Sequence, residues 1–340
     1  MFLHLQKVLR AASTQGGRRV DPANVSRFDH RPDETTYRSA RFRRCFESSG
    51  LIPRQVTVGF KNALLGALAK RAEQMVDVRA LHASPTWPRE LEPLRGFDAR
   101  ELLRSAARRA WVRELFTRVR EAAEGELLPR AADGSRPKLA VVDGPDDFLD
   151  HSRLAYRDAR GARREILLVR NPYGEAAVAM GALFRECGVE DVLVYGTAAS
   201  LDLASQVGEL HFASQATSAD GTVHHFKNQA LDARFAALHT HPGTRVDSRV
   251  VNVRSPLDEF DRDIERLRKD GHHLVEMELA GLLRGLRGGI ARVTALHVVS
   301  DVPQSADTLD GFSPARAERA LEAAVDVWVE AFGIADLELS

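Results

Sequence analysis

The sequence has only two cysteines, Cys45 and Cys187, and no apolar run approaching the ~18 residues that a membrane span needs. The cysteines lie far apart without a partner motif, so neither a disulfide framework nor a thiolate zinc site is expected. The first residues, MFLHLQKVLRAAS, lack the long apolar core of a signal peptide. These features predict a cytoplasmic protein without a membrane anchor.

Charge is distributed unevenly, although the formal net charge of the 340 residues is zero. Residues 1–130 carry 25 Lys and Arg against 15 Asp and Glu, a net charge of +10, and the remainder carries −10. Such asymmetry indicates surfaces with different partners. The basic part could be a solvated face or could contact the acidic part of the chain, an acidic protein or nucleic acid.

The pattern of residues changes at the polar stretch 131–137, which predicts two parts, residues 1–135 and 136–340. The first part shows helical periodicity near 62–68 and 98–119, so we expect a mainly helical accessory region. In the second part, short apolar strands alternate with helices, which predicts an α/β fold with a mixed central sheet. The expected strands are 139–142, 165–169, 192–195, 210–213, 250–253 and 291–299, and the expected helices are 176–186, 256–269, 275–286 and 314–332.

Three motifs in the second part combine apolar segments with groups that can carry chemistry. Gly196-Thr197-Ala198-Ala199-Ser200 follows the apolar strand 192–195, and we expect a turn there that brings backbone N–H groups close to a ligand. Glu276-Met277-Glu278 lies in an otherwise apolar segment, and Ser300-Asp301 follows the apolar residues 296–299. Buried carboxylates are costly unless they bind something.

The order and spacing of these motifs resemble the purine nucleoside phosphorylase and methylthioadenosine nucleosidase superfamily, of which the chain would be a divergent member. The resemblance covers about residues 138–335. It implies a three-layer α/β/α sandwich and cleavage of the N-glycosidic bond of a purine nucleoside or nucleotide. It also implies that the protein is a homo-oligomer and that the reaction needs no cofactor.

The resemblance assigns roles to the motif residues. Asp301, paired with Ser300, would donate a proton to the departing purine, provided that burial raises its pKa. Glu278 would bind the ribose hydroxyls and stabilise the positive charge that develops on the sugar, with Met277 against the sugar and Glu276 beside it. Gly196 and Thr197 would contact the ligand, and Phe260 is a candidate to stack on the base.

The sequence leaves two nucleophiles open, water and phosphate. Many phosphorylases of this superfamily have an arginine two residues before the glycine of the turn, where this chain has Val194. Its absence favours hydrolysis, although Arg170 could bind phosphate instead. The hydrolases activate water with a glutamate after the first strand, and the predicted first strand, 139–142, is followed by Asp143, Asp146 and Asp147.

Two further interpretations remain open. The substituted glycines and the missing arginine are also compatible with a non-catalytic module that senses a nucleotide. The histidine pairs His224-His225, His239-Thr240-His241 and His272-His273 lack the helical i, i+4 spacing of a zinc enzyme, so no metal site is predicted.

Overall fold

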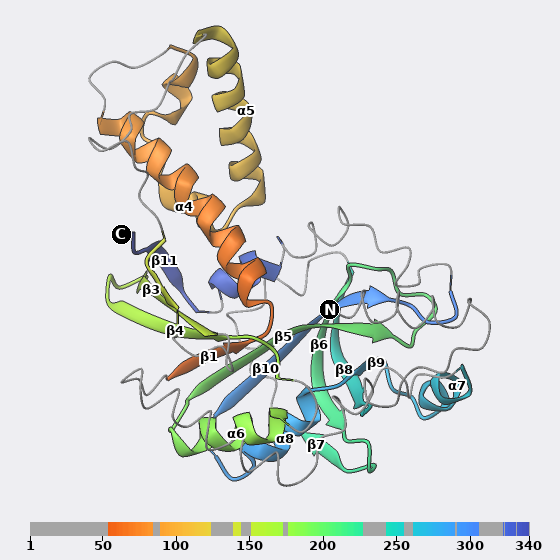
Figure 1. Cartoon of the computed structure of the whole chain (residues 1–340). Helices are drawn as coiled ribbons and strands as arrows, with labels where there is room; N and C mark the ends of the chain where they lie inside the picture. The colour runs from red at the N-terminus through yellow and green to blue at the C-terminus, as the bar shows by residue number, and fades with distance from the viewer. Residues whose placement is uncertain are drawn as a thin grey trace, which may run out of the picture.

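The computed structural model describes most of the chain after residue 53, and Figure 1 shows its arrangement. The described residues are 54–83, 89–123, 139–143, 151–172, 176–226, 243–254, 261–289, 291–305, 322, 324–330 and 332–339. They form a mixed α/β structure around an 11-stranded sheet. None of the described helices is long and apolar enough to cross a membrane.

The sheet has an order that does not follow the sequence, β10-β6-β8-β9-β5-β1-β4-β3-β11, with β2 beside β3 and β7 beside β6. Parallel and antiparallel pairs are mixed, as the sequence predicts. The strands are β1 (Gln55–Val58), β2 (Val141–Asp143), β3 (His151–Asp158), β4 (Arg163–Val169), β5 (Asp191–Ser200), β6 (Leu210–Thr217), β7 (Val223–His225), β8 (Thr244–Asn252), β9 (Leu274–Glu276), β10 (Arg292–Asp301) and β11 (Ile334–Leu337).

Five of the strands close into a ring, because β10 pairs with β5 as well as with β6. From β10 the ring continues through β6, β8 and β9 and returns to β5. The remaining central strands, β1, β4 and β3, extend outward from β5. The sheet is therefore not a simple open layer between two layers of helices, because part of it closes on itself.

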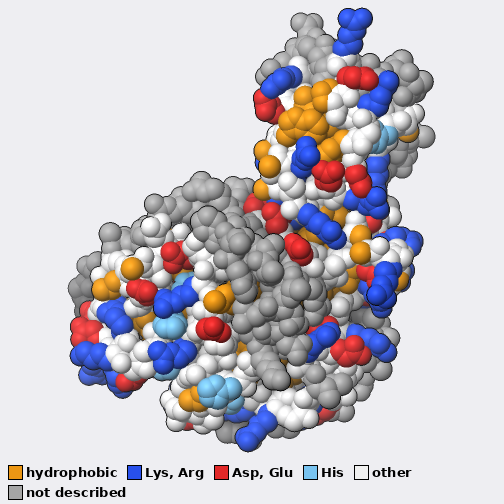
Figure 2. All heavy atoms as spheres, turned by 180° about the vertical axis from the view of Figure 1, so that it is seen from behind, with side chains coloured by type: hydrophobic (Ala, Val, Ile, Leu, Met, Phe, Trp, Pro, Cys, Tyr) orange, Lys and Arg blue, Asp and Glu red, His pale blue; other side chains and the backbone are white. Residues whose placement is uncertain are grey.

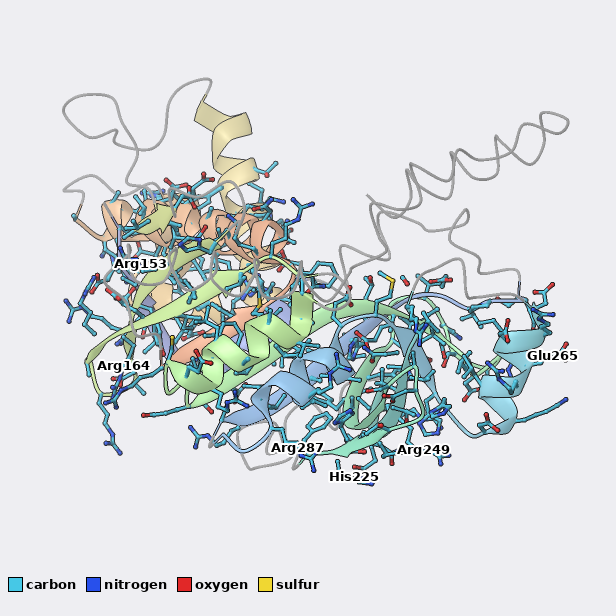
Figure 3. All side chains as sticks on the ribbon, turned by 60° about the horizontal axis from the view of Figure 1, so that its bottom comes forward. Arg153, Arg164, His225, Arg249, Glu265 and Arg287 are labelled. Atoms are coloured by element: carbon cyan, nitrogen blue, oxygen red, sulfur yellow. The ribbon has the colours of Figure 1, made fainter. Side chains whose placement is uncertain are left out.

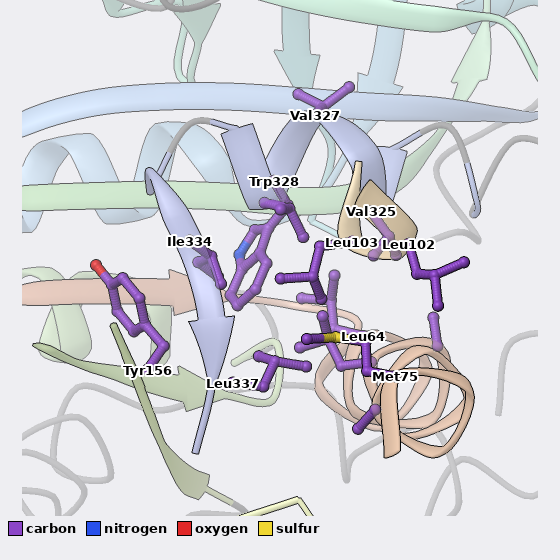
Figure 4. Close-up of a cluster of buried hydrophobic side chains, with 14 of the residues drawn as sticks. Leu64, Met75, Leu102, Leu103, Tyr156, Val325, Val327, Trp328, Ile334 and Leu337 are labelled. Carbon is purple, nitrogen blue, oxygen red and sulfur yellow. The ribbon is translucent and has the colours of Figure 1, made fainter. Parts of the chain in front are cut away.

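Helices lie on both faces of the sheet. On one face, α6 (Ala176–Glu186) and α8 (Leu279–Leu286) pack closely through Gly181 and Gly285, where a Cβ on either glycine would meet backbone atoms within 2.3 Å. On the other face lie α4 (Lys61–Ala83) and the helical residues 324–330. In Figure 4, Trp328 packs in this second core with Leu103, Leu64 and Met75 around it.

An arm projects from the sheet in Figure 1, made of α4 and α5 (Ala106–Ala123). Between these helices lie two 3₁₀ turns, η2 (Arg89–Leu94) and η3 (Ala99–Leu103). Asp98 caps η3 rather than the long helix predicted over 98–119, because its carboxylate accepts a bond from Arg100 N. Figure 2 shows hydrophobic side chains on the exposed surface of this arm.

Four charged residues connect the arm to the helical residues near the C-terminus. Arg71 on α4 is 1% exposed and contacts Glu322 and Asp326 at 3.1 and 2.8 Å. Arg109 on α5 contacts the same two carboxylates at 3.1 and 2.9 Å. Buried charges are tolerated when they are paired in this way. The arm is therefore joined to the rest of the molecule by a buried ion network.

The position of β1 corrects the sequence prediction. We predicted that the sheet begins after residue 135 with the strand 139–142. Instead, β1 lies between β4 and β5 and pairs in parallel with both, while β2 pairs only at the outer side of β3. Trp328 Nε1 also donates to Thr57 Oγ1 of β1 at 2.9 Å. Residues 55–58 thus form part of the sheet, so the predicted accessory region 1–135 supplies one of its central strands.

Helix α7 (Asp261–Lys269) falls within the predicted helix 256–269, whose first five residues lie outside the described part of the chain. Two predicted elements match closely: helix 176–186 has the bounds of α6, and strand 165–169 lies within β4. The helical residues 324–330 fall within the predicted helix 314–332. The strands β5, β6, β8 and β10 are all longer than predicted.

Candidate active site

The end of β5 brings two of the three predicted motifs together. Ala199 of β5 is paired on one side with Asp301 of β10 and on the other side with Val275 of β9. Strands lie about 4.8 Å apart, so β9 and β10 are separated by about 10 Å across β5. Ser300-Asp301 and Glu276 therefore flank the same short stretch of β5, although they lie far apart in the sequence.

Asp301 lies where β10 ends, and the side chain is 7% exposed. A register shift between Val299 and Asp301 interrupts the pairing with β5 at this point. Ser300 Oγ lies 2.6 Å from Asp301 Oδ1, to which it donates, and 3.2 Å from the Ala198 carbonyl oxygen. Burial raises the pKa of Asp301, and the hydrogen bond from Ser300 opposes part of that rise. This carboxyl group therefore keeps its proton to a higher pH than an exposed aspartic acid.

Glu276 ends β9 and caps helix α8. Its carboxylate accepts hydrogen bonds from the backbone N–H of Glu278 at 2.8 Å and of Leu279 at 3.0 and 3.1 Å. These N–H groups lie at the helix N-terminus, where a negative charge is favourable. Burial raises the pKa of Glu276, while the backbone hydrogen bonds act in the opposite direction. Because Glu276 accepts hydrogen bonds from more backbone N–H groups than Glu278 does, we assign the negative charge of the pair to it.

Glu278 occupies the residue before α8, and its side chain makes no capping hydrogen bond. Its pKa is raised well above the usual value by burial and by the negative charge of Glu276. The two glutamates thus form an unequal pair, with one proton favoured on Glu278 and the charge on Glu276. The helix predicted over 275–286 begins only at Leu279, because Glu276 belongs to β9 and supplies the cap.

The segment Gly196–Ser200 is a strand rather than the predicted turn. β5 continues through it to Ser200, and Gly196 is paired with His297 of β10. A Cβ at Gly196 would lie 3.5 Å from Asn171 Nδ2, an ordinary contact, so close packing does not require glycine here. Thr197 is the one exposed residue of β5, whereas its two neighbours are buried. Its hydroxyl group is therefore accessible to a ligand.

Two cations follow the neighbouring parallel strands β4 and β1. Arg170 is exposed directly after β4, and Lys61 lies three residues after β1 at the start of α4. Lys61 is 8% exposed and donates to Ser152 Oγ at 2.9 Å, with Asp143 Oδ1 at 3.9 Å. The Gly59 N–H donates to the Val169 carbonyl at 2.7 Å, which holds the two strand exits together.

Lys61 is a residue that the sequence analysis missed, because β1 was not recognised as a strand. The apolar alternation of QVTV followed by Gly59 is the signal that could have identified it. Asp143 is the last residue of the outer strand β2 and does not follow the first strand of the sheet as predicted, and Asp146 and Asp147 lie outside the described residues. The first strand is therefore followed by a cation and not by a carboxylate.

Phe260 also lies outside the described residues, so its predicted stacking role stays a prediction. Within the described part of the chain, no group of three His, Cys, Asp or Glu residues has the geometry to hold a metal ion.

Comparison with known proteins gives a likeness only at the level of structure. No protein-family model matches this sequence, and no curated protein matches it. The chain resembles nucleosidases and nucleoside phosphorylases. An S-adenosylhomocysteine nucleosidase from Streptococcus pyogenes is 14% identical with a TM-score of 0.47, over 56% of this chain and 87% of that one.

Two further solved structures show the same level of similarity. A uridine phosphorylase from Vibrio fischeri is 16% identical with a TM-score of 0.46, over 57% of this chain and 82% of that one. A futalosine hydrolase of Helicobacter pylori is 13% identical with a TM-score of 0.46, over 57% of this chain and 88% of that one. At such low identity, the likeness concerns the arrangement of the chain and not the activity.

Two buried histidines lie opposite each other on the neighbouring strands β6 and β10. His211 and His297 are paired in register and are 0% and 1% exposed. Burial lowers the pKa of His211 to about 4 and that of His297 to about 3, so both are neutral at pH 7. His211 Nδ1 lies 3.1 Å from Ser248 Oγ. Because all three side chains are buried, we interpret them as part of the core of the strand ring.

Proposed function

We propose that this protein cleaves the N-glycosidic bond of a purine nucleoside or nucleotide and releases the free base, with water as the nucleophile. One observation carries the proposal: a buried carboxyl group with a raised pKa and a buried pair of carboxyl groups flank the same end of β5. N-glycosidic cleavage needs both functions, an acid for the leaving base and a negative group for the sugar.

Asp301 is assigned the role of the acid. A departing purine becomes a better leaving group when N7 is protonated, and a carboxyl group that is protonated before the reaction can donate this proton. Ser300 would accept no proton itself but would hold Asp301 Oδ1 through its hydrogen bond. Asp301 loses its proton as the base leaves, and the resulting carboxylate is reprotonated from solvent.

The Glu276–Glu278 pair is assigned the role of binding and stabilising the sugar. The transition state resembles an oxocarbenium ion, and the single negative charge of the pair would stabilise it in a buried position. Glu278 has no capping bond and can exchange hydrogen bonds with ribose hydroxyl groups, while Glu276 remains fixed by the start of α8. Met277 between them would pack against the sugar, and Thr197 would contact the substrate through its accessible hydroxyl.

Phosphorolysis is a second candidate, and the exit of β1 favours it. Lys61 and Arg170 are cations that follow adjacent strands, and inorganic phosphate could bind between them if Arg170 turns toward Lys61. Val194 supplies no positive charge on β5. Hydrolysis and phosphorolysis therefore differ in whether base release depends on added phosphate.

The test is to follow free base by chromatography with adenosine, inosine, guanosine, methylthioadenosine and AMP, with and without phosphate. We expect Asp301→Asn to lower the rate of base release by about 10²–10⁴-fold, the usual contribution of a general acid. Asp191→Asn is the matched control, since Asp191 begins β5 at the other end of the same strand. Equal rates for wild-type protein and Asp301→Asn would refute the role of Asp301.

The phosphate dependence of the same assay separates the two candidates. Release without phosphate supports hydrolysis, and release only with phosphate, lost in Arg170→Gln, supports phosphorolysis. Tight nucleotide binding by a folded protein that releases no base from any substrate would refute both and favour a nucleotide sensor.

A further inference from the structure

Asn252, the last residue of β8, lies beside one of the two glutamates that we assign to the sugar. It is paired in parallel with Glu276 of β9, and the Val253 N–H donates to the Glu276 carbonyl oxygen at 2.9 Å. Neighbouring strands lie about 4.8 Å apart, so side chains at paired positions can reach the same ligand. Arg249 of the same strand is exposed and lies at the edge of the molecule in Figure 3, whereas Asn252 is only 7% exposed. Asn252 therefore belongs to the interior of the molecule at the end of β8.

The oxygen of the Asn252 amide is held by the start of α8. Asn252 Oδ1 accepts a hydrogen bond from the Ala280 N–H at 3.1 Å. The Glu276 carboxylate accepts from the N–H groups of Glu278 and Leu279, so side chains from two strands bind three successive N–H groups of this turn. Because a backbone N–H can only donate, the bond from Ala280 also decides which end of the amide is the oxygen. The Asn252 side chain is therefore fixed in one orientation.

The nitrogen of the same amide is not used. Asn252 Nδ2 carries two N–H donors, and neither is bonded to any residue that the structure describes. An unpaired N–H in a mostly buried amide is unfavourable, and the cost is removed when a ligand brings an acceptor oxygen to it. The amide is attached to the turn that begins directly after Glu278. Asn252 Nδ2 is thus an oriented donor beside the turn that carries this glutamate.

A ribose hydroxyl group needs both kinds of partner, because it donates one hydrogen bond and accepts others. The Glu276–Glu278 pair carries a negative charge and supplies mainly acceptor oxygens. Asn252 Nδ2 would supply the missing donor. A substrate without the hydroxyl group would leave both protein groups unpaired in a buried position, and a site built in this way discriminates strongly against such a substrate.

We propose that Asn252 is a specificity-determining residue that selects ribonucleosides over deoxynucleosides, an inference that rests on the proposed function. Its Nδ2 donates to the oxygen of one ribose hydroxyl group, at the 2′ or the 3′ position, and Glu278 accepts the hydrogen bond from the same group. Its Oδ1 stays on the Ala280 N–H, so that the donor and Glu278 are held by the same turn of the chain. One amide therefore joins the position of α8 to the recognition of the sugar.

The test compares kcat/KM for the nucleoside that the full-length protein cleaves best with kcat/KM for its 2′-deoxy and 3′-deoxy forms. Asn252→Asp keeps an oxygen for the Ala280 N–H but removes the donors. We expect one of the two ratios of ribonucleoside to deoxynucleoside to fall about tenfold, the loss typical of one hydrogen bond, while the other ratio stays unchanged. Asn252→Ala removes the donors without adding a charge and should lower the same ratio. Ser248→Ala is the matched control, since Ser248 is buried on the same strand and contacts His211, and it should leave both ratios unchanged.

A ratio of two kcat/KM values does not depend on the concentration of active enzyme, so a variant that folds only in part still gives an interpretable result. Unchanged ratios in both Asn252 variants would overturn the proposal. An equal fall of both ratios would also overturn it, because it would show that Asn252 acts by holding the turn before α8 and not by binding one hydroxyl group. Wild-type protein that releases no base from any nucleoside would refute the proposed function and the role of Asn252 with it. Base release with unchanged ratios would refute the role of Asn252 alone.

Discussion

Replacement of Arg71 by methionine tests whether the α4–α5 arm is an integral part of the fold. Methionine keeps much of the apolar stem of the side chain but removes the guanidinium group that contacts Glu322, Asp326 and the Leu103 carbonyl. Breaking a buried ion pair from one side typically costs about 3–5 kcal/mol, because the remaining charge is left unpaired.

The structure indicates a value near the lower end of that range. The side chains of Glu322 and Asp326 are 34% and 24% exposed, so water can solvate them in part, and both keep their contacts with Arg109. We therefore expect Arg71→Met to lower the free energy of unfolding by about 3 kcal/mol. Urea denaturation followed by circular dichroism and by tryptophan fluorescence measures this change.

The matched control is Arg100→Met, which removes an arginine from an exposed pair with Asp98 and should change stability little. If the arm is part of the fold, both probes should report one transition that shifts together in Arg71→Met. A loss below about 1 kcal/mol, or a separate early transition that alone responds to the substitution, would contradict our interpretation of the ion network.

Further predictions concern the helix contact, the carboxylate pair and the buried histidines. Gly285→Ala would place a Cβ 2.2 Å from the Val178 carbonyl oxygen. We expect thermal denaturation to show that the free energy of unfolding falls by about 1–3 kcal/mol. Glu276→Gln removes the charge beside Glu278, so carboxyl NMR titration should show a lower pKa for Glu278. His211 and His297 are neutral when folded, with pKa values of about 4 and about 3, against 6.5 when exposed. The unfolded chain therefore binds more protons below pH 6.5, and the stability present above that pH should fall as the pH decreases toward 4. A flat profile between pH 6.5 and 4 would contradict this.

The sequence was sufficient to identify strands with continuous apolar runs. The strand 165–169 lies within β4 because ILLV is buried on both faces of a central strand. Strands whose ends are polar were predicted too short, as in β6, which continues through Gln215 to Thr217. Local hydrophobicity does not report pairing with a neighbouring strand, and pairing decides where these strands end.

β1 was missed for a different reason. The only local signal is the short alternation of Gln55–Val58, and the burial of these residues depends on β4, β5 and Trp328, which lie more than a hundred residues away. Such long-range contacts cannot be read from periodicity. As a result, the sequence analysis placed residues 55–58 in the accessory region and did not identify Lys61.

The candidate site was predicted in part. The spacing of Ser300-Asp301 and Glu276-Met277-Glu278 identified groups that the structure brings to the two sides of β5. The resemblance assigned the ribose to Glu278, but the sequence did not show that Glu276 is the cap, since this follows from the hydrogen bonds to the start of α8. The catalytic and binding roles of these residues stay predictions until the variants are measured.

The closure of the five strands has a consequence for self-association. Strands inside the ring have partners on both sides over at least part of their length, and the outer strands of the described sheet are β2, β7 and β11. These have 3, 3 and 4 residues. Short edge strands offer few unpaired N–H and C=O groups to an incoming strand, which protects a sheet of this size against aggregation through strand addition.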